Sequence, residues 1–182
     1  ISFPYIYNSA LWILLPPNRE DIDGFIGNYV GTDKYVNKEP IKKLKSKGYS
    51  KNQVIQLYKK GKIDFNFEDR FNKSIQILKE KESSCDVKVS EFIEKNIRFH
   101  KLFFTHNHPT TCVFIHCLNQ ILFILKCDYK YDEFAYPDNI SKLPGRWPHT
   151  IYDKQYWKFK YNVIVNNNWY LQHINRIYDY SK

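Results

Sequence analysis

Residues able to do chemistry gather between Leu102 and Leu122, in the stretch LFFTHNHPTTCVFIHCLNQIL. It holds three histidines, two cysteines and one proline at the edge of an apolar run. Residues 102–104 predict a short buried strand, and Pro109 is suited to the first turn of a helix, where its missing N–H costs nothing. The polar residues from Thr105 to Thr110 therefore fall between a strand and a helix N-terminus.

A helix N-terminus favours chemistry, because its first N–H groups have no partner within the helix and its dipole attracts an anion or a developing oxyanion. His106 and His108 supply bases that work near neutral pH. Asn107, between them, can fix a histidine tautomer or bind a substrate. Acid–base catalysis and phosphate binding are both open to this segment.

Helix capping is a second interpretation of the same residues. Asn107 or His108 would cap the helix, Thr110 and Thr111 would satisfy its first N–H groups, and the histidines would have no further role.

Metal binding is a third interpretation, with four ligands: His106, His108, Cys112 and His116. Cys112 and His116 are four residues apart, on one face of the predicted helix. That helix is apolar nearly all round and no matching carboxylate is evident, so we expect no metal ion.

The elements around this segment follow from hydrophobic spacing and from residues that begin or end helices. The opening ISFPYIY predicts a strand, Ser50 is suited to capping a helix, and Ser90 to capping another. Helices are predicted near residues 18–31, 40–47, 50–60, 65–82, 90–97 and 168–178. The apolar run after Pro109 predicts the central core helix. The pattern indicates an α/β fold that is mostly helical with a few short strands.

Charge and cysteine content limit the kinds of partner and the location that we expect for this protein. The net charge of +9 comes mainly from lysines in residues 34–62, which would attract polyanions such as nucleic acid, CoA or sugar nucleotides. Nucleic-acid binding is not predicted, because arginine clusters and RNA-binding motifs are missing. The four cysteines lack disulfide-scaffold or zinc spacing. Without a signal peptide or a run of 18 apolar residues, we expect a cytoplasmic protein with no membrane span.

Several segments resemble one known family. CDVKVSEFIEKNIRFHKLFFTHNHPTTCVFIHCLNQIL is similar to the region of WcbI-type polysaccharide biosynthesis proteins that has CDV, a short helix, NHPT and a long apolar helix. FPYIYNSALWILLP, GYSKNQVIQLYKKGKID and LPGRWPH resemble further parts of that family. The resemblance runs loosely along most of the chain, and residues 107–110 with the lead-in at residues 85–87 are its most specific part.

The resemblance implies an acetyltransferase that moves an acetyl group from acetyl-CoA to a sugar or sugar nucleotide, for a capsular or surface glycan. It implies the helix-rich portion of a Rossmann-like three-layer assembly. The family's N-terminal strand and its cysteine motif have no counterpart here, and the chain contains no Met. We therefore expect residues 1–182 to be one domain, the C-terminal part of a longer protein with a preceding N-terminal domain. A non-catalytic binding or assembly module of a glycan-modifying enzyme is the alternative.

Under this resemblance, His108 is the acid–base candidate, Asn107 orients it or binds the acyl oxygen, and His106 ranks third. Four further residues are candidates for binding CoA, through its phosphates: Thr105, Thr110, Arg98 and Lys101.

Overall fold

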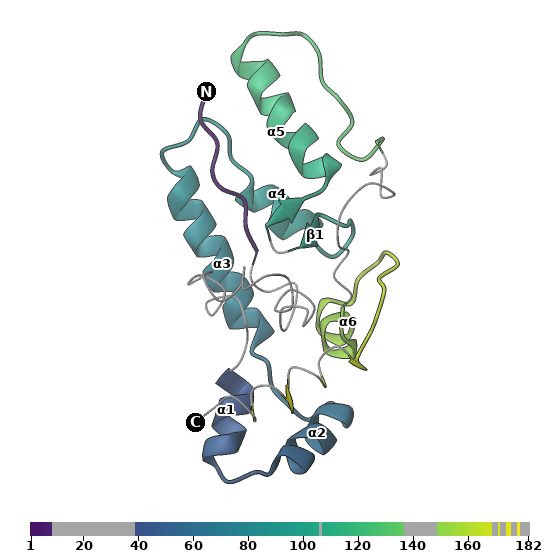
Figure 1. The fold of residues 1–182 in the computed structure, drawn as a ribbon. Helices are drawn as coiled ribbons and strands as arrows, with labels where there is room; N and C mark the ends of the chain where they lie inside the picture. The colour runs from purple at the N-terminus through teal and green to yellow at the C-terminus, as the bar shows by residue number, and fades with distance from the viewer. Residues whose placement is uncertain are drawn as a thin grey trace, which may run out of the picture. The chain divides into compact units, whose positions relative to one another are not determined.

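The described part of the chain is built mostly from helices (Figure 1). The computed structural model describes residues 1–8, 39–105, 107–136 and 149–168, with residues 171, 174, 175 and 178. Within these residues there are six helices and one two-stranded sheet, which confirms the α/β, helix-rich prediction. The Rossmann-like layers implied by the resemblance stay a prediction.

The chain divides into two compact units. The first unit contains residues Ile1–Leu11, Glu68–Trp147 and Trp157–Val163. The second unit contains residues Trp12–Phe67, Pro148–Tyr156 and Ile164–Lys182. The expectation that residues 1–182 form one domain of a longer protein stays a prediction.

Three helices, α1 (Glu39–Ser46), α2 (Lys51–Lys59) and α6 (Ile151–Trp157), belong to the second unit, apart from the last residue of α6. Gly48 follows α1 with φ 83°, a left-handed conformation that favours glycine. Ser50 caps α2 as predicted: its hydroxyl accepts from Gln53 N at 3.4 Å, and Ser50 N donates to Gln53 Oε1 at 2.8 Å.

Aromatic and aliphatic side chains from these helices and from the chain beyond them form the core of the second unit. Tyr152 stacks on Tyr58 with ring centroids 5.2 Å apart, and its hydroxyl donates to Tyr58 O at 2.7 Å. Burial raises the pKa of Tyr58 well above its usual range. The buried members of this cluster are Ile41, Val54, Tyr58, Ile63, Phe65, Phe67, Tyr152 and Ile174.

In the first unit, a buried carboxylate joins α4 (Ser90–Asn96) to α3 (Phe67–Glu82), of which only the first residue belongs to the second unit. Glu82 Oε2 accepts from Val89 N at 2.8 Å and from Ser90 N at 3.1 Å, at the start of α4. The prediction that Ser90 caps this helix is therefore wrong. Ser90 is the first helical residue, and its hydroxyl donates to Glu82 instead.

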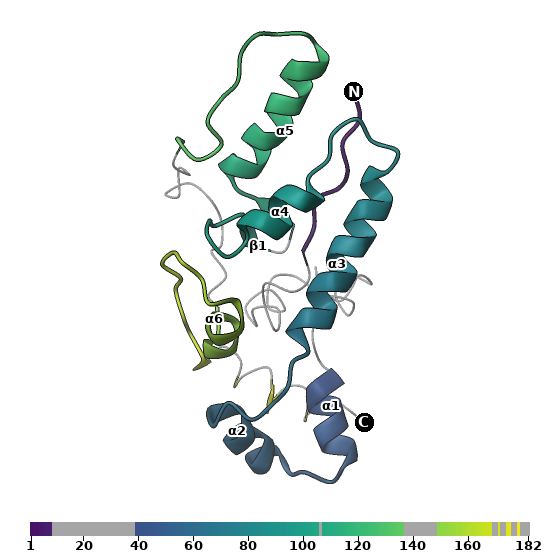
Figure 2. The ribbon, with the colours of Figure 1, turned by 180° about the vertical axis from the view of Figure 1, so that it is seen from behind.

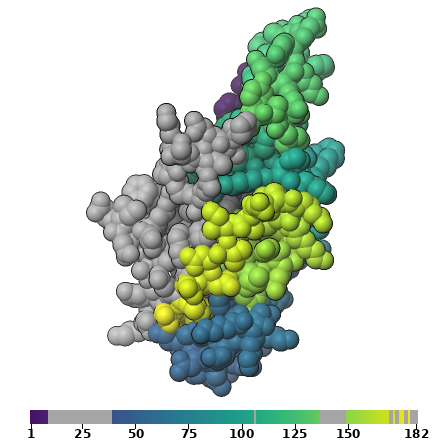
Figure 3. Space-filling model, turned by 90° about the vertical axis from the view of Figure 1, so that its right-hand side faces the viewer, coloured from purple at the N-terminus to yellow at the C-terminus, as the bar shows by residue number. Residues whose placement is uncertain are grey.

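The strand β1 (Phe103–Thr105) pairs antiparallel with β2 (His108–Pro109), and α5 (Thr111–Ile124) follows directly (Figure 2). Pro109 lies in β2, so the prediction that it opens the helix is wrong. The predicted central core role of α5 is also wrong, because its buried residues are only Cys112, Val113 and Cys117. The space-filling view shows the surface of this helix open to solvent (Figure 3).

The first eight residues form no strand, contrary to the prediction for ISFPYIY. They run beside α3 in both ribbon views. Ser2 N donates to Asp86 Oδ2 at 2.7 Å, and Ser74 Oγ donates to Tyr7 O at 3.4 Å. These long-range contacts help to hold the segment on the first unit.

Other predictions have mixed outcomes. The helices predicted near 40–47, 65–82 and 90–97 are present with boundaries shifted by a few residues. Near the C-terminus, residues 168, 171, 174, 175 and 178 are helical, as predicted. The helix predicted at 18–31, the LPGRWPH segment up to residue 148 and His106 lie outside the described residues.

Candidate active site

The β1–β2 hairpin brings together three of the predicted site residues. Thr105 and His108 are register partners across the two strands, and Asn107 lies in the turn between them. Antiparallel pairing with so short a turn places both side chains at the same end of the hairpin. His106, the third catalytic candidate, lies outside the described residues, so its place in this site stays a prediction.

A chain of hydrogen bonds links these side chains. Thr105 Oγ1 donates to Asn107 Oδ1 at 3.1 Å and lies 2.5 Å from His108 Nδ1. Because the hydroxyl has one proton and gives it to Asn107, Thr105 Oγ1 accepts from His108 Nδ1–H. Asn107 Nδ2 then donates to Tyr5 Oη at 3.1 Å. With Thr105 Oγ1 donating to Asn107 Oδ1, this set of hydrogen bonds corresponds to the tautomer of His108 that has its proton on Nδ1.

This arrangement determines which nitrogen of His108 can act as a base. With the proton on Nδ1, the lone pair is on Nε2, at the far side of the ring from Thr105. Thr105 is 2% exposed whereas His108 is exposed. The imidazole is therefore held by Thr105 on its Nδ1 side, while the residue itself lies exposed at the rim of the hairpin.

Thr110 has a structural place beside this site. Its hydroxyl donates to Lys101 O at 2.8 Å, and its N–H donates to Leu102 O at 2.9 Å. Thr110 is the N-cap residue of α5, yet its side chain makes no capping hydrogen bond. The capping interpretation is thus wrong for Asn107 and His108, which precede the N-cap residue and lie in the hairpin.

The two positively charged candidates lie on the segment between α4 and β1. Lys101 is half-buried, with Nζ 4.6 Å from the centroid of the Phe104 ring. Arg98 has an exposed side chain, and its carbonyl oxygen accepts from Lys160 N at 2.8 Å. In the described residues no hydrogen bond joins the Arg98 side chain to the hairpin, so its role stays a prediction.

Cys112 and His116 are the two ligands on α5 that the metal interpretation proposes. Each of them contacts a different set of neighbours. Cys112 is 7% exposed and its Sγ lies 3.1 Å from Thr110 Oγ1. His116 Nδ1 lies 3.4 Å from Glu133 Oε1. Across the described part of the chain, histidines, cysteines and carboxylates form no group of three able to hold a metal ion.

Tyr5 completes the site, and the sequence patterns did not single it out. It lies 102 positions before Asn107, and its hydroxyl accepts the last hydrogen bond of the chain. The nitrogen Nζ of Lys81 lies 5.8 Å from the Tyr5 ring centroid. A signal was present, because Tyr5 falls in the FPYIY segment that resembles the same family as NHPT.

Residues 40–128 match the family model described as polysaccharide biosynthesis enzyme WcbI. This segment is therefore similar to the WcbI family. The match covers just under half of the chain and includes both GYSKNQVIQLYKKGKID and the stretch from Cys85 to Leu122, which confirms the predicted resemblance there. It contains the whole β1–β2 hairpin and α5.

The outer segments FPYIYNSALWILLP and LPGRWPH lie outside the matched WcbI residues. Comparison with curated proteins and with solved structures gave no match. The described helices include none with the length and apolar run needed to cross a membrane.

Proposed function

We propose that this WcbI-like chain is an acetyltransferase that moves an acetyl group from acetyl-CoA to a hydroxyl of a sugar or sugar nucleotide in surface or capsular glycan biosynthesis. The observation that carries the proposal is the hydrogen-bond chain from Tyr5 through Asn107 and Thr105 to His108. It fixes a general base, His108, on an exposed rim, which is what transfer to an alcohol needs.

His108 performs the central step. Its Nε2 accepts the proton of the sugar hydroxyl as the sugar oxygen attacks the acetyl carbonyl, forming a C–O bond. Thr105 Oγ1 holds the opposite nitrogen and stabilises the imidazolium that results. The proton then passes from Nε2 to the departing sulfur, so the base is regenerated. Acetyl-CoA supplies the activated thioester, whose C–S bond breaks.

The four candidates for binding the phosphates of CoA differ in charge and in exposure. Arg98 and Lys101 carry the charge that its phosphates require, and both lie within a few residues of β1. Thr105 and Thr110 are 2% and 1% exposed, and their hydroxyls are occupied by Asn107 and Lys101 O. We therefore assign phosphate binding to the two cations and hairpin support to the two threonines.

A thermal-shift measurement with CoA, acetyl-CoA and adenosine 3′,5′-bisphosphate tests donor binding. A ligand that binds only the folded chain raises its melting temperature, by an amount that grows with ligand concentration over Kd. We expect a shift with all three, and a smaller one for Arg98→Ala and Lys101→Ala. The absence of any shift at millimolar concentrations would refute the proposal and favour a non-catalytic module.

Thiol release from acetyl-CoA, in the presence of a glycan acceptor, tests the role of His108. Removing a general base lowers rates by roughly 10²- to 10⁴-fold. We expect a loss of this size for His108→Ala, with an unchanged melting temperature. His100→Gln is the control for loss of an imidazole, because the His100 ring stacks on Phe134. Full activity in His108→Ala would refute the mechanism.

A further inference from the structure

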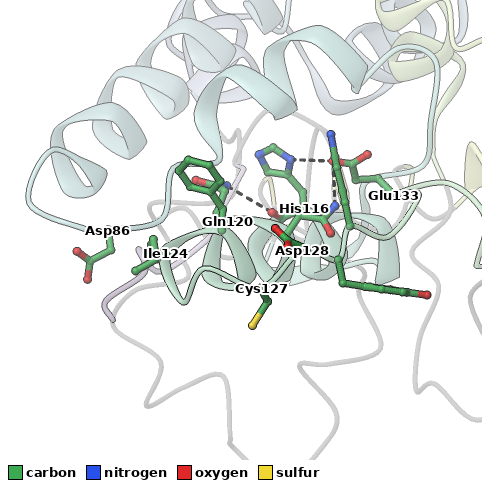
Figure 4. A pocket seen from close by; sticks show the side chains of 11 residues that line it. Asp86, His116, Gln120, Ile124, Cys127, Asp128 and Glu133 are labelled. Atoms are coloured by element: carbon green, nitrogen blue, oxygen red, sulfur yellow. Dashed lines mark hydrogen bonds and ion pairs between the residues drawn. The ribbon is translucent and has the colours of Figure 1, made fainter.

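A pocket of about 640 Å³ lies in the first unit, away from the hairpin (Figure 4). It runs along the second half of α5 and the segment after that helix. Its lining includes His116, Phe123, Asp128, Tyr129 and Glu133.

The pocket is bounded on one side by a fixed segment of chain. Asn119 Nδ2 donates to Tyr131 O at 2.9 Å, and Tyr131 N donates to Asn119 Oδ1 at 2.9 Å. Glu133 Oε1 lies 3.4 Å from His116 Nδ1, and Figure 4 shows these two groups facing each other. Three side chains of α5 and its following segment thus interlock, which makes this wall preformed.

Gln120, another residue of the lining, is held by the segment before α4. Gln120 forms a two-way pair with Lys88: its Nε2 donates to Lys88 O at 2.7 Å, and its Oε1 accepts from Lys88 N at 2.9 Å. The His116 ring stacks on Phe92, with centroids 4.2 Å apart. The side-chain amides of Asn119 and Gln120 therefore hold the backbone around the pocket, and we do not assign them to ligand binding.

Other polar atoms of the lining can bind a ligand. Within the described residues, the hydrogen bonds of Glu133 all go to Oε1, which leaves Oε2 as an acceptor. Since His116 Nδ1 faces a carboxylate, its second nitrogen is the one that can meet a ligand. Asp128 adds an exposed carboxylate, and Phe123 and Tyr129 are 83% and 62% exposed.

The charge of the lining contrasts with that of the whole chain. The lining contains three acidic residues, Asp86, Asp128 and Glu133, and one lysine, Lys130, although the net charge of the chain is +9. The Asp86 carboxylate is bound to Ser2 and lies beside the Ile1 ammonium, so Asp128 and Glu133 supply the negative charge of the pocket. Like charges repel, so this pocket disfavours CoA, nucleotides and other phosphates. It suits a ligand that is neutral or positively charged.

We propose that this pocket binds one pyranose ring of a glycan, a neutral or amino sugar. Exposed aromatic rings pack against the C–H face of a pyranose, and their negative π-face attracts those polarised C–H groups. Carboxylate oxygens accept hydrogen bonds from sugar hydroxyls or an ammonium group. The choice of a sugar rests on the proposed function, but the recognition itself requires neither CoA nor His108.

The place of the pocket indicates what the bound sugar does. The hairpin lies at the N-terminus of α5, a 14-residue helix that spans roughly 21 Å, and the pocket lies along its second half. A sugar held there is an anchor for a longer glycan rather than the ring that receives the acetyl group. Binding energy from such a remote ring positions the reacting ring.

Saturation-transfer NMR on the whole chain tests the site with three probes: methyl galactopyranoside, methyl glucosaminide and methyl glucuronide. We expect signals with at least one of the first two, and none with the negatively charged glucuronide. Tyr129→Ala and Asp128→Asn should each weaken binding at least tenfold. Phe114→Ala is the matched control, because Phe114 is 58% exposed on the same helix and lies outside the pocket lining.

His108→Ala separates this inference from the proposed function. It should bind the sugar probe with unchanged affinity while losing acetyl transfer. Signals with a neutral or amino sugar that Tyr129→Ala abolishes would support the pocket even if CoA does not bind. The inference is overturned if no neutral or amino sugar gives a signal, if the glucuronide binds best, or if Phe114→Ala weakens binding as much as Tyr129→Ala.

Discussion

Thr105 determines how His108 is held, although its own side chain is buried. In Thr105→Val the Oγ1 acceptor for Nδ1–H is lost, so the imidazole can turn and change tautomer. We expect transfer to fall about tenfold, as is usual when the partner of a functional histidine is removed. Thr105→Ser restores the acceptor and should restore most of the rate.

The nitrogen NMR shifts of His108 distinguish positioning from a general loss of structure. The native chain and Thr105→Ser should both show the proton on Nδ1, whereas Thr105→Val should show a mixture of tautomers. Equal rates and equal shifts in all three chains would contradict the hydrogen-bond chain.

The four cysteines differ in reactivity for reasons of burial, and none is in a disulfide. Burial raises the pKa of the Cys117 thiol to about 11, so at pH 8 roughly one molecule in a thousand carries the reactive thiolate. Cys127 is exposed at the rim of the pocket. We expect iodoacetamide to label Cys127 first and Cys117 last, measured by mass spectrometry. Equal labelling rates would contradict the buried position of Cys117.

At the scale of elements, α4 depends on a carboxylate from another helix. Glu82 is 6% exposed and accepts hydrogen bonds from Val89 N, Ser90 N and Ser90 Oγ. Glu82→Gln keeps the volume but removes a charge from the N-terminus of α4. We expect the free energy of unfolding to fall by about 2 kcal/mol, measured with urea.

Glu80→Gln is the matched control for this prediction, because Glu80 is exposed on the same helix and its carboxylate accepts a hydrogen bond from Gln76. Its effect should stay within about 0.5 kcal/mol. A similar loss in both variants would mean that Glu82 acts through general charge and not as a cap.

The sequence could predict those elements whose stabilising residues lie close together in the chain. Ser50 and Gln53 are three residues apart, so the capping box of α2 is visible in the chain itself. The cap of α4 comes from Glu82, seven residues before Val89, which no local pattern of α4 shows. Pro109 is suited both to a helix start and to an edge strand, and tertiary pairing with Phe103 decides between them.

The residues of the candidate site also differ in whether local sequence could predict them. His108 and Asn107 could be predicted from type and spacing, whereas Tyr5 joins them only through the folding of residues 1–8 onto the first unit. The apolar composition of α5 predicted burial, but it cannot show what covers a helix. Phe123 is 83% exposed because the chain beyond α5 forms a pocket with it instead of a closed core.

At the scale of the whole molecule, the N-terminal segment connects distant parts of the first unit. Ser2 contacts Asp86 through its backbone N–H and its hydroxyl, and three residues later Tyr5 contacts Asn107. Loss of the first contact should therefore weaken the second. We expect Asp86→Asn to lower acetyl transfer modestly, without removing any residue of the hairpin.

The pH dependence of this attachment follows from the pKa of Asp86. Hydrogen bonds from Ser2 lower the pKa of this carboxyl below its ordinary value. A lowered pKa in the folded state means that the stabilisation is complete above the ordinary value, and is lost as the pH falls through the lowered one. Residues 1–8 should thus detach in acid before α5 unfolds.

Amide hydrogen exchange measured by NMR at several acidic pH values, corrected for the intrinsic exchange rate, tests this order. We expect protection of Ser2 N–H to be lost as Asp86 is protonated, while Val113 N–H, which donates to Thr110 O in the first turn of α5, stays protected. Asp86→Asn should lack Ser2 protection at neutral pH, whereas Glu91→Gln, a change in an exposed pair with Lys95, should behave as the native chain. Protection of Ser2 that does not depend on pH in the native chain would show that other contacts, such as Ser74 with Tyr7, hold the segment.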